Sequence, residues 1–324
     1  MTPETSGDRP ALTIAVIAHR VRGYPANCLG ALGADRPAPG IEYLWVEGPE
    51  APANPDGFPG VRRVTISDGD RAAAKNRALS EAQGELVLLM TADIQAAPGA
   101  VEALRRAARS RDGGAAVSAQ LLLENGLVRR TDFGFPSAAR ELNPLRWIAS
   151  FVRGFQRRGT QPSASGVRPA RSLHAACLMA TREVFDKVGP FTEGYRFALE
   201  DIEWSDRAHA AGVPLLIAHE AHAFKLAPQR RGALEPAASV ELERSLRRLV
   251  RRRRSGVAAG AYVAARVGKH LAVWLASALV DTVFCGAWRS VRHERRCRRA
   301  LLWMRQSEPV PPEAESHVRW ESSC

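Results

Sequence analysis

Four short runs with the composition of β-strands in the first 90 residues most constrain how this chain folds. They cover residues 12–18 (LTIAVIA), 41–46 (IEYLWV), 61–66 (VRRVTI) and 85–90 (ELVLLM). Each is rich in β-branched or aliphatic residues and too short for an ordinary helix. Loops or helical stretches separate them, and strands that alternate with such segments pair in parallel through crossover connections. We therefore predict an α/β fold with a mainly parallel sheet flanked by helices.

The fourth run leads directly into Thr91-Ala92-Asp93, and Pro98 then opens a helix. Reactive groups in a parallel sheet gather beyond the carboxyl ends of its strands. Asp93 is therefore expected where such a sheet carries its chemistry.

A second acidic pair, Glu200-Asp201, begins a helical segment that ends at Gly212. Acidic residues at the start of a helix are favoured by the helix dipole. Taken alone, the pair is more simply explained as N-terminal capping residues than as reactive groups.

Charge is distributed unevenly along the chain. The whole chain carries +12, and residues 239–300 contain 15 Arg or Lys but only four Asp or Glu, a net charge of +11. Only four of the 46 basic residues are lysine, so arginine abundance by itself carries little information. Any anionic partner is expected at residues 239–300.

These shifts in composition predict four parts. We expect a disordered N-terminus (1–10), an α/β domain (11–238), a basic amphipathic helical region (239–306) and a disordered tail (307–324). Within the α/β domain, residues 124–170 form a long irregular region, and a loop of that length is either mobile or functional.

The basic region contains two kinds of helix. Residues 241–254 place Leu242, Leu246, Leu249 and Val250 on one face and arginines on the rest. Residues 271–288 are 18 mostly apolar residues with Asp281 among them, whereas a spanning helix needs about 20 apolar residues. We favour helices that lie on an anionic membrane surface or pack against the α/β domain over a true membrane span of residues 271–288. A solvated or oligomeric hairpin is a further alternative. Nucleic-acid binding is not predicted, since there is no aromatic interleaving or known motif.

The five cysteines are far apart and include no CxxC pair. Neither a zinc site nor a disulfide framework is indicated. Residues 1–10 are polar where a signal peptide would need an apolar run, so we expect a cytoplasmic protein.

Taken together, residues 11–226 resemble the family 2 glycosyltransferases with the GT-A fold, especially the rhamnosyltransferase-like members. The matching segments, in order, are LTIAVIAHR, IEYLWVEG, RAAAKNRALSEAQGE, LVLLMTAD, HAACLMATREVFDKVGPF and ALEDIEWSDRAHAAG. No single segment is specific to this family, but their order and spacing over two hundred residues are hard to obtain by chance.

The resemblance implies an inverting glycosyltransferase that moves a sugar from a nucleotide-diphosphate sugar to an acceptor hydroxyl. Asp201, with Glu200 beside it, matches the family's catalytic base, and a carboxylate within hydrogen-bond reach suffices for that role. Asp93 matches the family's ligand for Mg²⁺ or Mn²⁺, which stabilises the leaving diphosphate.

The same resemblance assigns residues to the donor pocket. Glu47 stands where the family usually has an Asp that binds the base or ribose, and His19 and Arg20 lie where base and phosphate contacts occur. Lys75 and Asn76 match a basic-Asn pair that lines the pocket. A solvated loop remains the alternative for His19 and Arg20, and a capping or packing role for Asn76.

Two positions depart from the family pattern. Thr91 replaces the first acid of the usual Asp-x-Asp, and Lys225 stands where a metal-binding histidine is common, although a slip along the strand would bring His222 there. Three outcomes remain open: a weakened metal site of Asp93 and His222, a metal-independent site in which Lys225 neutralises the diphosphate, or an inactive site.

The expected acceptor is a lipid-linked glycan, another glycan or a small molecule, and the basic region would suit a lipid-linked one. A catalytically silent relative that binds a nucleotide-sugar or a glycan is the main alternative. A nucleotidyltransferase is less favoured. Such an enzyme usually carries a Gly-rich basic loop after its first strand, whereas the corresponding loop here, HRVRGYP, has one glycine.

Overall fold

The computed structural model divides the chain into two compact units, which we describe separately. The first unit contains the strands and helices α1 to α7, and the second contains helices α8 to α10. The structure describes residues 9–19, 25–35, 37–48, 58–67, 69–123, 126–129, 131–132, 135–136, 143, 166–196, 198–226, 236–283 and 289–303.

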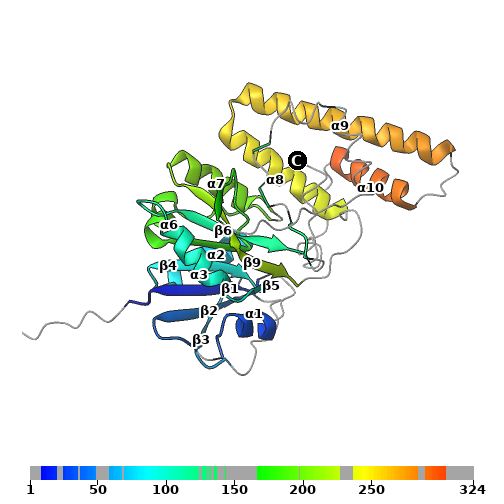
Figure 1. Ribbon diagram of the computed structural model, residues 1–324. Helices are drawn as coiled ribbons and strands as arrows, with labels where there is room; N and C mark the ends of the chain where they lie inside the picture. Colours follow the sequence, from blue (N-terminus) through cyan, green and yellow to red (C-terminus); the bar gives the residue numbers. More distant parts are fainter. Residues whose placement is uncertain are drawn as a thin grey trace, which may run out of the picture. The chain divides into compact units, whose positions relative to one another are not determined.

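One mixed sheet forms the first unit (Figure 1). Its strands are β1 (Leu12–Ile17), β2 (Ile41–Glu47), β3 (Val61–Thr65), β4 (Leu86–Thr91), β5 (Ile94–Ala96), β6 (Ala116–Leu122), β7 (Val167–Pro169), β8 (Cys177–Thr181) and β9 (Leu215–Lys225). They are arranged in the order β3-β2-β1-β4-β8-β6-β9-β5, and β7 also pairs with β9. The predicted α/β class is confirmed.

The four predicted strands form the parallel part of the sheet. β1 pairs in parallel with β2 on one side and with β4 on the other, and β2 pairs in parallel with β3. All six residues of β1 are buried, as expected for a strand covered on both faces.

β8 is antiparallel to β4 and to β6, whereas β9 is parallel to β6. It follows that β4, β6 and β9 run in the same direction. The carboxyl ends of β1, β2, β4 and β9 therefore meet at one edge of the sheet, together with the start of β8. This edge collects side chains that are more than 100 residues apart in the sequence.

Helices cover both faces of this sheet (Figure 1). α1 (Pro25–Ala31) and α3 (Ala100–Ala108) pack on one face, and α2 (Arg71–Glu81), α6 (Arg182–Val188) and α7 (Glu200–Ala210) on the other. Asp70 caps α2 by accepting a hydrogen bond from the backbone N–H of Ala73 at 3.0 Å, and Thr181 caps α6 in the same way.

The second unit contains three helices, α8 (Pro236–Arg253), α9 (Gly256–Val283) and α10 (Arg289–Trp303). Their charges meet in a buried network around Glu243 of α8, whose side chain is 1% exposed. Glu243 accepts hydrogen bonds from Arg247 at 3.0 Å and from Arg266 of α9 at 2.7 Å, and lies 3.3 Å from Nε2 of His270. Nδ1 of His270 lies 2.7 Å from a guanidinium nitrogen of Arg298 in α10, so one carboxylate links all three helices.

In the described part of the chain, no helix is long and apolar enough to cross a membrane. Most of the predicted disordered ends and of residues 124–170 falls outside the described residues, as does the side chain of Asp281.

We predict that Glu243→Gln strongly destabilises the second unit. The substitution leaves Arg266 and His270 buried without their carboxylate, and breaking a buried ion pair in this way costs about 3–5 kcal/mol of unfolding free energy. Thermal and urea unfolding of the full chain at pH 7.5 measure the effect.

Glu241→Gln is the matched control, because its partner Arg244 is 35% exposed and such pairs contribute about 1 kcal/mol or less.

Burial acts to raise the pKa of Glu243, but His270 and Arg266 outweigh it and lower that pKa below its ordinary value of 4.5. The stability that Glu243 supplies is therefore fully present above pH 4.5, and the gap to Glu243→Gln narrows as the pH falls below that value. Equal stability of the two variants at pH 7.5 would contradict the network.

Candidate active site

Asp93 lies at the carboxyl end of β4, where the sequence predicted it. Its side chain is 1% exposed, and one of its oxygens accepts a hydrogen bond from the hydroxyl of Thr91 at 2.7 Å. Its other oxygen is paired with the ammonium group of Lys225, at the end of β9. Burial acts to raise the pKa of Asp93, but Lys225 and Thr91 outweigh it and lower that pKa below its ordinary value.

Lys225, not His222, is the residue that reaches Asp93. The two residues are three apart on β9, and successive side chains of a strand point to opposite faces, so His222 points away from the face that carries Lys225. No cluster of three or more His, Cys, Asp or Glu suited to a metal ion occurs among the described residues. The predicted metal pair of Asp93 and His222 therefore has no geometric support in the structure.

Lys75 and Glu200 form a buried ion pair across the first unit. Nζ of Lys75, on α2, donates to Oε1 of Glu200 at 2.5 Å, and the two side chains are 4% and 5% exposed. Burial acts to raise the pKa of Glu200, and Lys75 and Arg71 overcome that effect, so the pKa is lowered. Glu200 is thus an ionised carboxylate with a fixed partner.

Asp201, the next residue, has the opposite electrostatic setting. Its oxygen Oδ1 accepts a hydrogen bond from the backbone N–H of Ile202 at 2.9 Å, and Oδ2 lies 3.7 Å from Nδ1 of His174. Burial, and then the charge of Glu200, raise the pKa of Asp201 to about 6. A carboxyl group with that pKa can accept a proton near neutral pH, which is the property required of a general base.

Backbone strain lies directly before this pair. Leu199 has φ of 87°, the only positive φ among the described residues other than glycine. Such a conformation costs on the order of 1–3 kcal/mol and persists where the surrounding structure imposes it. It sets the direction in which α7 begins and hence where Glu200 and Asp201 point.

His174 is a site residue that sequence reasoning missed. It precedes β8, at the same edge of the sheet, and burial together with the nearby charges of Arg129, Lys225, Lys75 and Arg71 holds its pKa well below its ordinary value. His174 is therefore neutral at physiological pH. Its only sequence signal is its place at the start of the matching segment HAACLMA, because the antiparallel direction of β8 is not evident from sequence.

The predicted donor-binding residues near β1 and β2 also lie at this edge. Nε2 of His19 lies 3.0 Å from the carbonyl oxygen of Gly69, and the ring packs so closely on Gly48 that a Cβ there would lie 2.0 Å from Nδ1. Glu47 accepts hydrogen bonds from Arg63 at 2.6 Å and from the indole of Trp45 at 3.2 Å. Arg20 lies outside the described residues. Nucleotide binding by these residues stays a prediction.

Asn76 is held by the backbone of a neighbouring segment. Its amide donates to the carbonyl of Phe191 at 2.9 Å and accepts from the N–H of the same residue at 2.8 Å. These bonds favour the packing role that the sequence left open.

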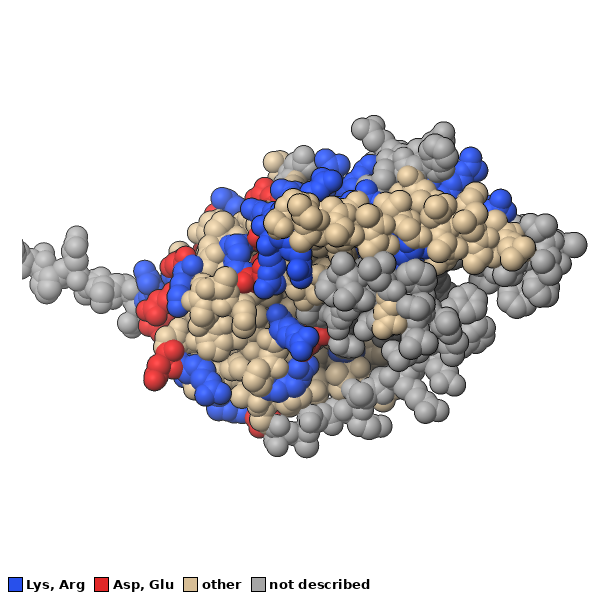
Figure 2. All heavy atoms as spheres, turned by 90° about the horizontal axis from the view of Figure 1, so that it is seen from above, with Lys and Arg blue, Asp and Glu red and all other residues tan. Residues whose placement is uncertain are grey.

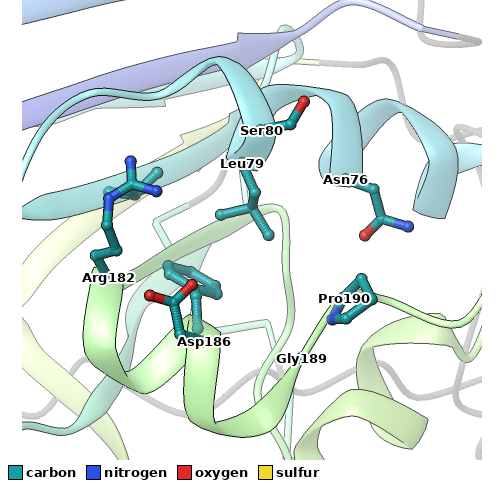
Figure 3. Close-up of a pocket in the computed structure, with 9 residues that line it drawn as sticks. Asn76, Leu79, Ser80, Arg182, Asp186, Gly189 and Pro190 are labelled. Carbon is teal, nitrogen blue, oxygen red and sulfur yellow. The ribbon is translucent and has the colours of Figure 1, made fainter.

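Asn76 also lines a cavity of about 390 Å³ between α2 and α6, together with Leu79, Arg182 and Asp186 (Figure 3). None of the acidic residues at the sheet edge lines this cavity. We therefore place the candidate active site at the edge, where the charged groups converge, and not in the cavity.

Comparison with known proteins agrees with the fold. No family model matches the sequence. Two curated relatives, the N-acetylglucosaminyl-diphospho-decaprenol L-rhamnosyltransferases of Mycobacterium tuberculosis strains CDC 1551 / Oshkosh and ATCC 25618 / H37Rv, are each 28% identical over 131 residues. The match covers 39% of this chain and 42% of each relative, so the chain spans less than half the length of the relatives it matches.

Among solved structures, the crystal structure of GalNAc-T7 with UDP, GalNAc and Mn²⁺ has a TM-score of 0.51 and 10% sequence identity, and covers 75% of this chain and 48% of that chain. Staphylococcus aureus TarS 1-349 in complex with UDP-GlcNAc has a TM-score of 0.45 and 13% identity, and covers 91% of each chain. The chain thus has a mixed α/β fold of the GT-A type and resembles the rhamnosyltransferase-like glycosyltransferases, as its motifs predicted.

Proposed function

We propose that this protein is an inverting glycosyltransferase that moves a sugar from a nucleotide-diphosphate sugar to an acceptor hydroxyl. The observation that carries the proposal is Asp201, a buried carboxyl group with a pKa of about 6 at the sheet edge that also holds Asp93. The relatives named as rhamnosyltransferases support sugar transfer as the reaction.

In this proposal Asp201 accepts the proton of the acceptor hydroxyl as that oxygen attacks the anomeric carbon. The bond between that carbon and the diphosphate breaks, and its electron pair leaves with the diphosphate. Glu200 is not available as the base, because its charge is already paired with Lys75. Its negative charge acts instead on Asp201 and keeps the pKa of the base high.

A divalent cation does not fit the donor set around Asp93. Thr91 directs a hydroxyl proton at one carboxylate oxygen and Lys225 directs an ammonium group at the other. The proposed transfer therefore has no step that uses Mg²⁺ or Mn²⁺.

We further propose that the second unit binds the inner face of the cell membrane peripherally, which would suit a lipid-linked acceptor such as the decaprenol-linked one in the relatives' name. Every exposed position of α9 whose side chain the structure describes is Gly, Ala, Val or Leu. The larger ones are Val257, Val267, Leu271, Leu275 and Leu279, each at least 39% exposed. Figure 2 looks onto this helix, whose surface is tan along its length.

An anionic bilayer is the occupant that matches this face. Arg251 to Arg254, just before α9, are exposed, and residues 239–300 carry a net charge of +11. An apolar helix face combined with basic residues binds the interface of anionic membranes, with each basic residue near the surface contributing about 1 kcal/mol.

A catalytically silent protein that binds a nucleotide-sugar or a glycan is the second candidate. Thr91 and Lys225 favour it, because neither residue can supply the carboxylate or imidazole ligand of a metal-dependent transferase. Binding of a nucleotide-sugar without any turnover would identify it.

We predict that Asp201→Asn lowers kcat for sugar transfer by at least 100-fold, because the amide cannot accept the hydroxyl proton. A radiolabelled or mass-spectrometric transfer assay with a panel of UDP-, dTDP- and GDP-sugars measures the effect. Asp112→Asn, an exposed substitution after α3, is the matched control and should leave the rate unchanged. Transfer by Asp201→Asn at the wild-type rate would rule out the proposed base.

The pH dependence of kcat/KM should follow the ionisation of Asp201. Only the ionised carboxylate accepts a proton, so the rate is expected to fall about tenfold per pH unit below pH 6 and to level off above it. Steady-state kinetics between pH 4.5 and 8 test this expectation. A flat profile over that range would mean that a group with a different pKa acts as the base.

For the membrane surface, we predict that the full chain sediments with vesicles containing about 30% anionic lipid and only weakly with zwitterionic ones, and that added salt weakens the binding. Leu275→Asp should lower the bound fraction at least fivefold, because it places a charge on a face of α9 that is 53% exposed at this residue. Val167→Asp on β7, where the side chain is 40% exposed, is the control and should bind as the wild type does. Equal sedimentation of both variants contradicts the proposal, and a dimer that Leu275→Asp dissociates would assign the face to a second copy of the chain.

A further inference from the structure

The carboxylate at the end of β4 is neutralised from within the chain. Thr91 donates to one oxygen of Asp93 and Lys225 to the other. The side chain of Asp93 is 1% exposed and that of Lys225 is 12% exposed. A buried carboxylate requires a cation, and here an ammonium group supplies it.

Strand pairing fixes Lys225 in this position. In the antiparallel ladder of β5 and β9, Ile94 lies opposite Lys225. The backbone N–H of Leu226 also donates to the carbonyl of Asp93 at 2.8 Å. The strand register therefore places the backbone of Lys225 next to that of Asp93. The position of the ammonium group does not depend only on the reach of a flexible side chain.

The charges at residues 91, 93 and 225 balance without a metal. Asp93 carries one negative charge, Thr91 none, and Lys225 one positive charge. A second carboxylate at position 91 would leave a net charge of −1 on these three groups, a setting that favours a divalent cation as an additional partner. With Thr91, a single ammonium group is sufficient.

Cationic side chains gather at this edge. Arg71, Lys75, Arg129 and Lys225 all act electrostatically on His174, and each of them lowers its pKa. A group of cations of this kind attracts an anion.

We propose that the ammonium group of Lys225 binds the diphosphate of the donor while it stays paired with Asp93, so that this protein binds its nucleotide-diphosphate sugar without a divalent metal. The proposal rests on the proposed function and specifies how the donor is recognised. In the bound state the ammonium group has three donors, one directed at Asp93 and the others available to phosphate oxygens. Lys225 then stabilises the negative charge that grows on the leaving diphosphate.

Isothermal titration calorimetry of the full chain with UDP, dTDP, GDP and ADP, in EDTA and in Mn²⁺, tests this inference without relying on turnover. We expect one of these diphosphates to bind with Kd values that agree within about twofold in the two buffers. Lys225→Met should weaken binding in EDTA at least tenfold, whereas Lys225→Arg, which keeps the charge, should bind within about threefold of the wild type.

The matched gain-of-function variant is Thr91→Asp combined with Lys225→His. It replaces the hydroxyl and the ammonium group by a carboxylate and an imidazole, which are ligands that Mn²⁺ accepts. This variant should take up Mn²⁺ alone in an electron paramagnetic resonance titration, and Mn²⁺ should raise its affinity for the diphosphate at least tenfold. The wild type should take up no Mn²⁺ under the same conditions.

The outcomes separate this inference from the proposed function. Wild-type binding that requires Mn²⁺, or EDTA binding that Lys225→Met leaves unchanged in a variant folded by circular dichroism, overturns the role of Lys225 alone. Absence of binding to any diphosphate in either buffer overturns both the role of Lys225 and the proposed donor. Metal-independent binding that depends on Lys225, combined with no sugar transfer, supports the inference and rejects the transferase in favour of the silent alternative.

Discussion

Burying three carboxylates at one edge of a sheet is the constraint on which the rest of this structure depends. Asp93, Glu200 and Asp201 are each less than 10% exposed, and an isolated buried charge costs several kcal/mol. The chain meets that cost with cations from distant segments, Lys75 on α2 and Lys225 on β9. The strand order is what makes this feasible, since it brings the ends of β4 and β9 and the start of α7 to a common region.

Two of the three carboxyl groups are paired with an ammonium group and the third is not, and this difference separates their roles. Lys75 contacts Glu200 and Lys225 contacts Asp93, and both of these acids have lowered pKa values. Among the described residues, no lysine or arginine forms an ion pair with Asp201, and burial and Glu200 raise its pKa to about 6. The neutral His174 at 3.7 Å does not neutralise it. Two adjacent residues in the sequence thus have opposite protonation behaviour because only one of them faces an ammonium group.

The sequence was sufficient for the parallel half of the sheet and for the position of Asp93, because short apolar runs report burial on both faces and the residue after such a run lies at the sheet edge. It was not sufficient for residues whose position depends on strand direction. His174 lies at the edge only because β8 is antiparallel. Lys225 reaches Asp93, and His222 does not, because of which face of β9 each occupies. Trp204, three residues after Asp201 on α7, is fully buried and stacks on Phe191 with ring centroids 5.3 Å apart, so it packs in the core.

The helical unit illustrates the same dependence on direction. In the sequence, Arg266 and His270 interrupt the apolar run of α9. In the structure both side chains point inward to Glu243, at 2.7 Å and 3.3 Å, and are 4% and 2% exposed. The buried network therefore removes these charges from the outer face and leaves that face to Leu271, Leu275 and Leu279. A helix too polar to cross a bilayer can still present a wholly apolar side to one, because its polar residues are paired on the other side.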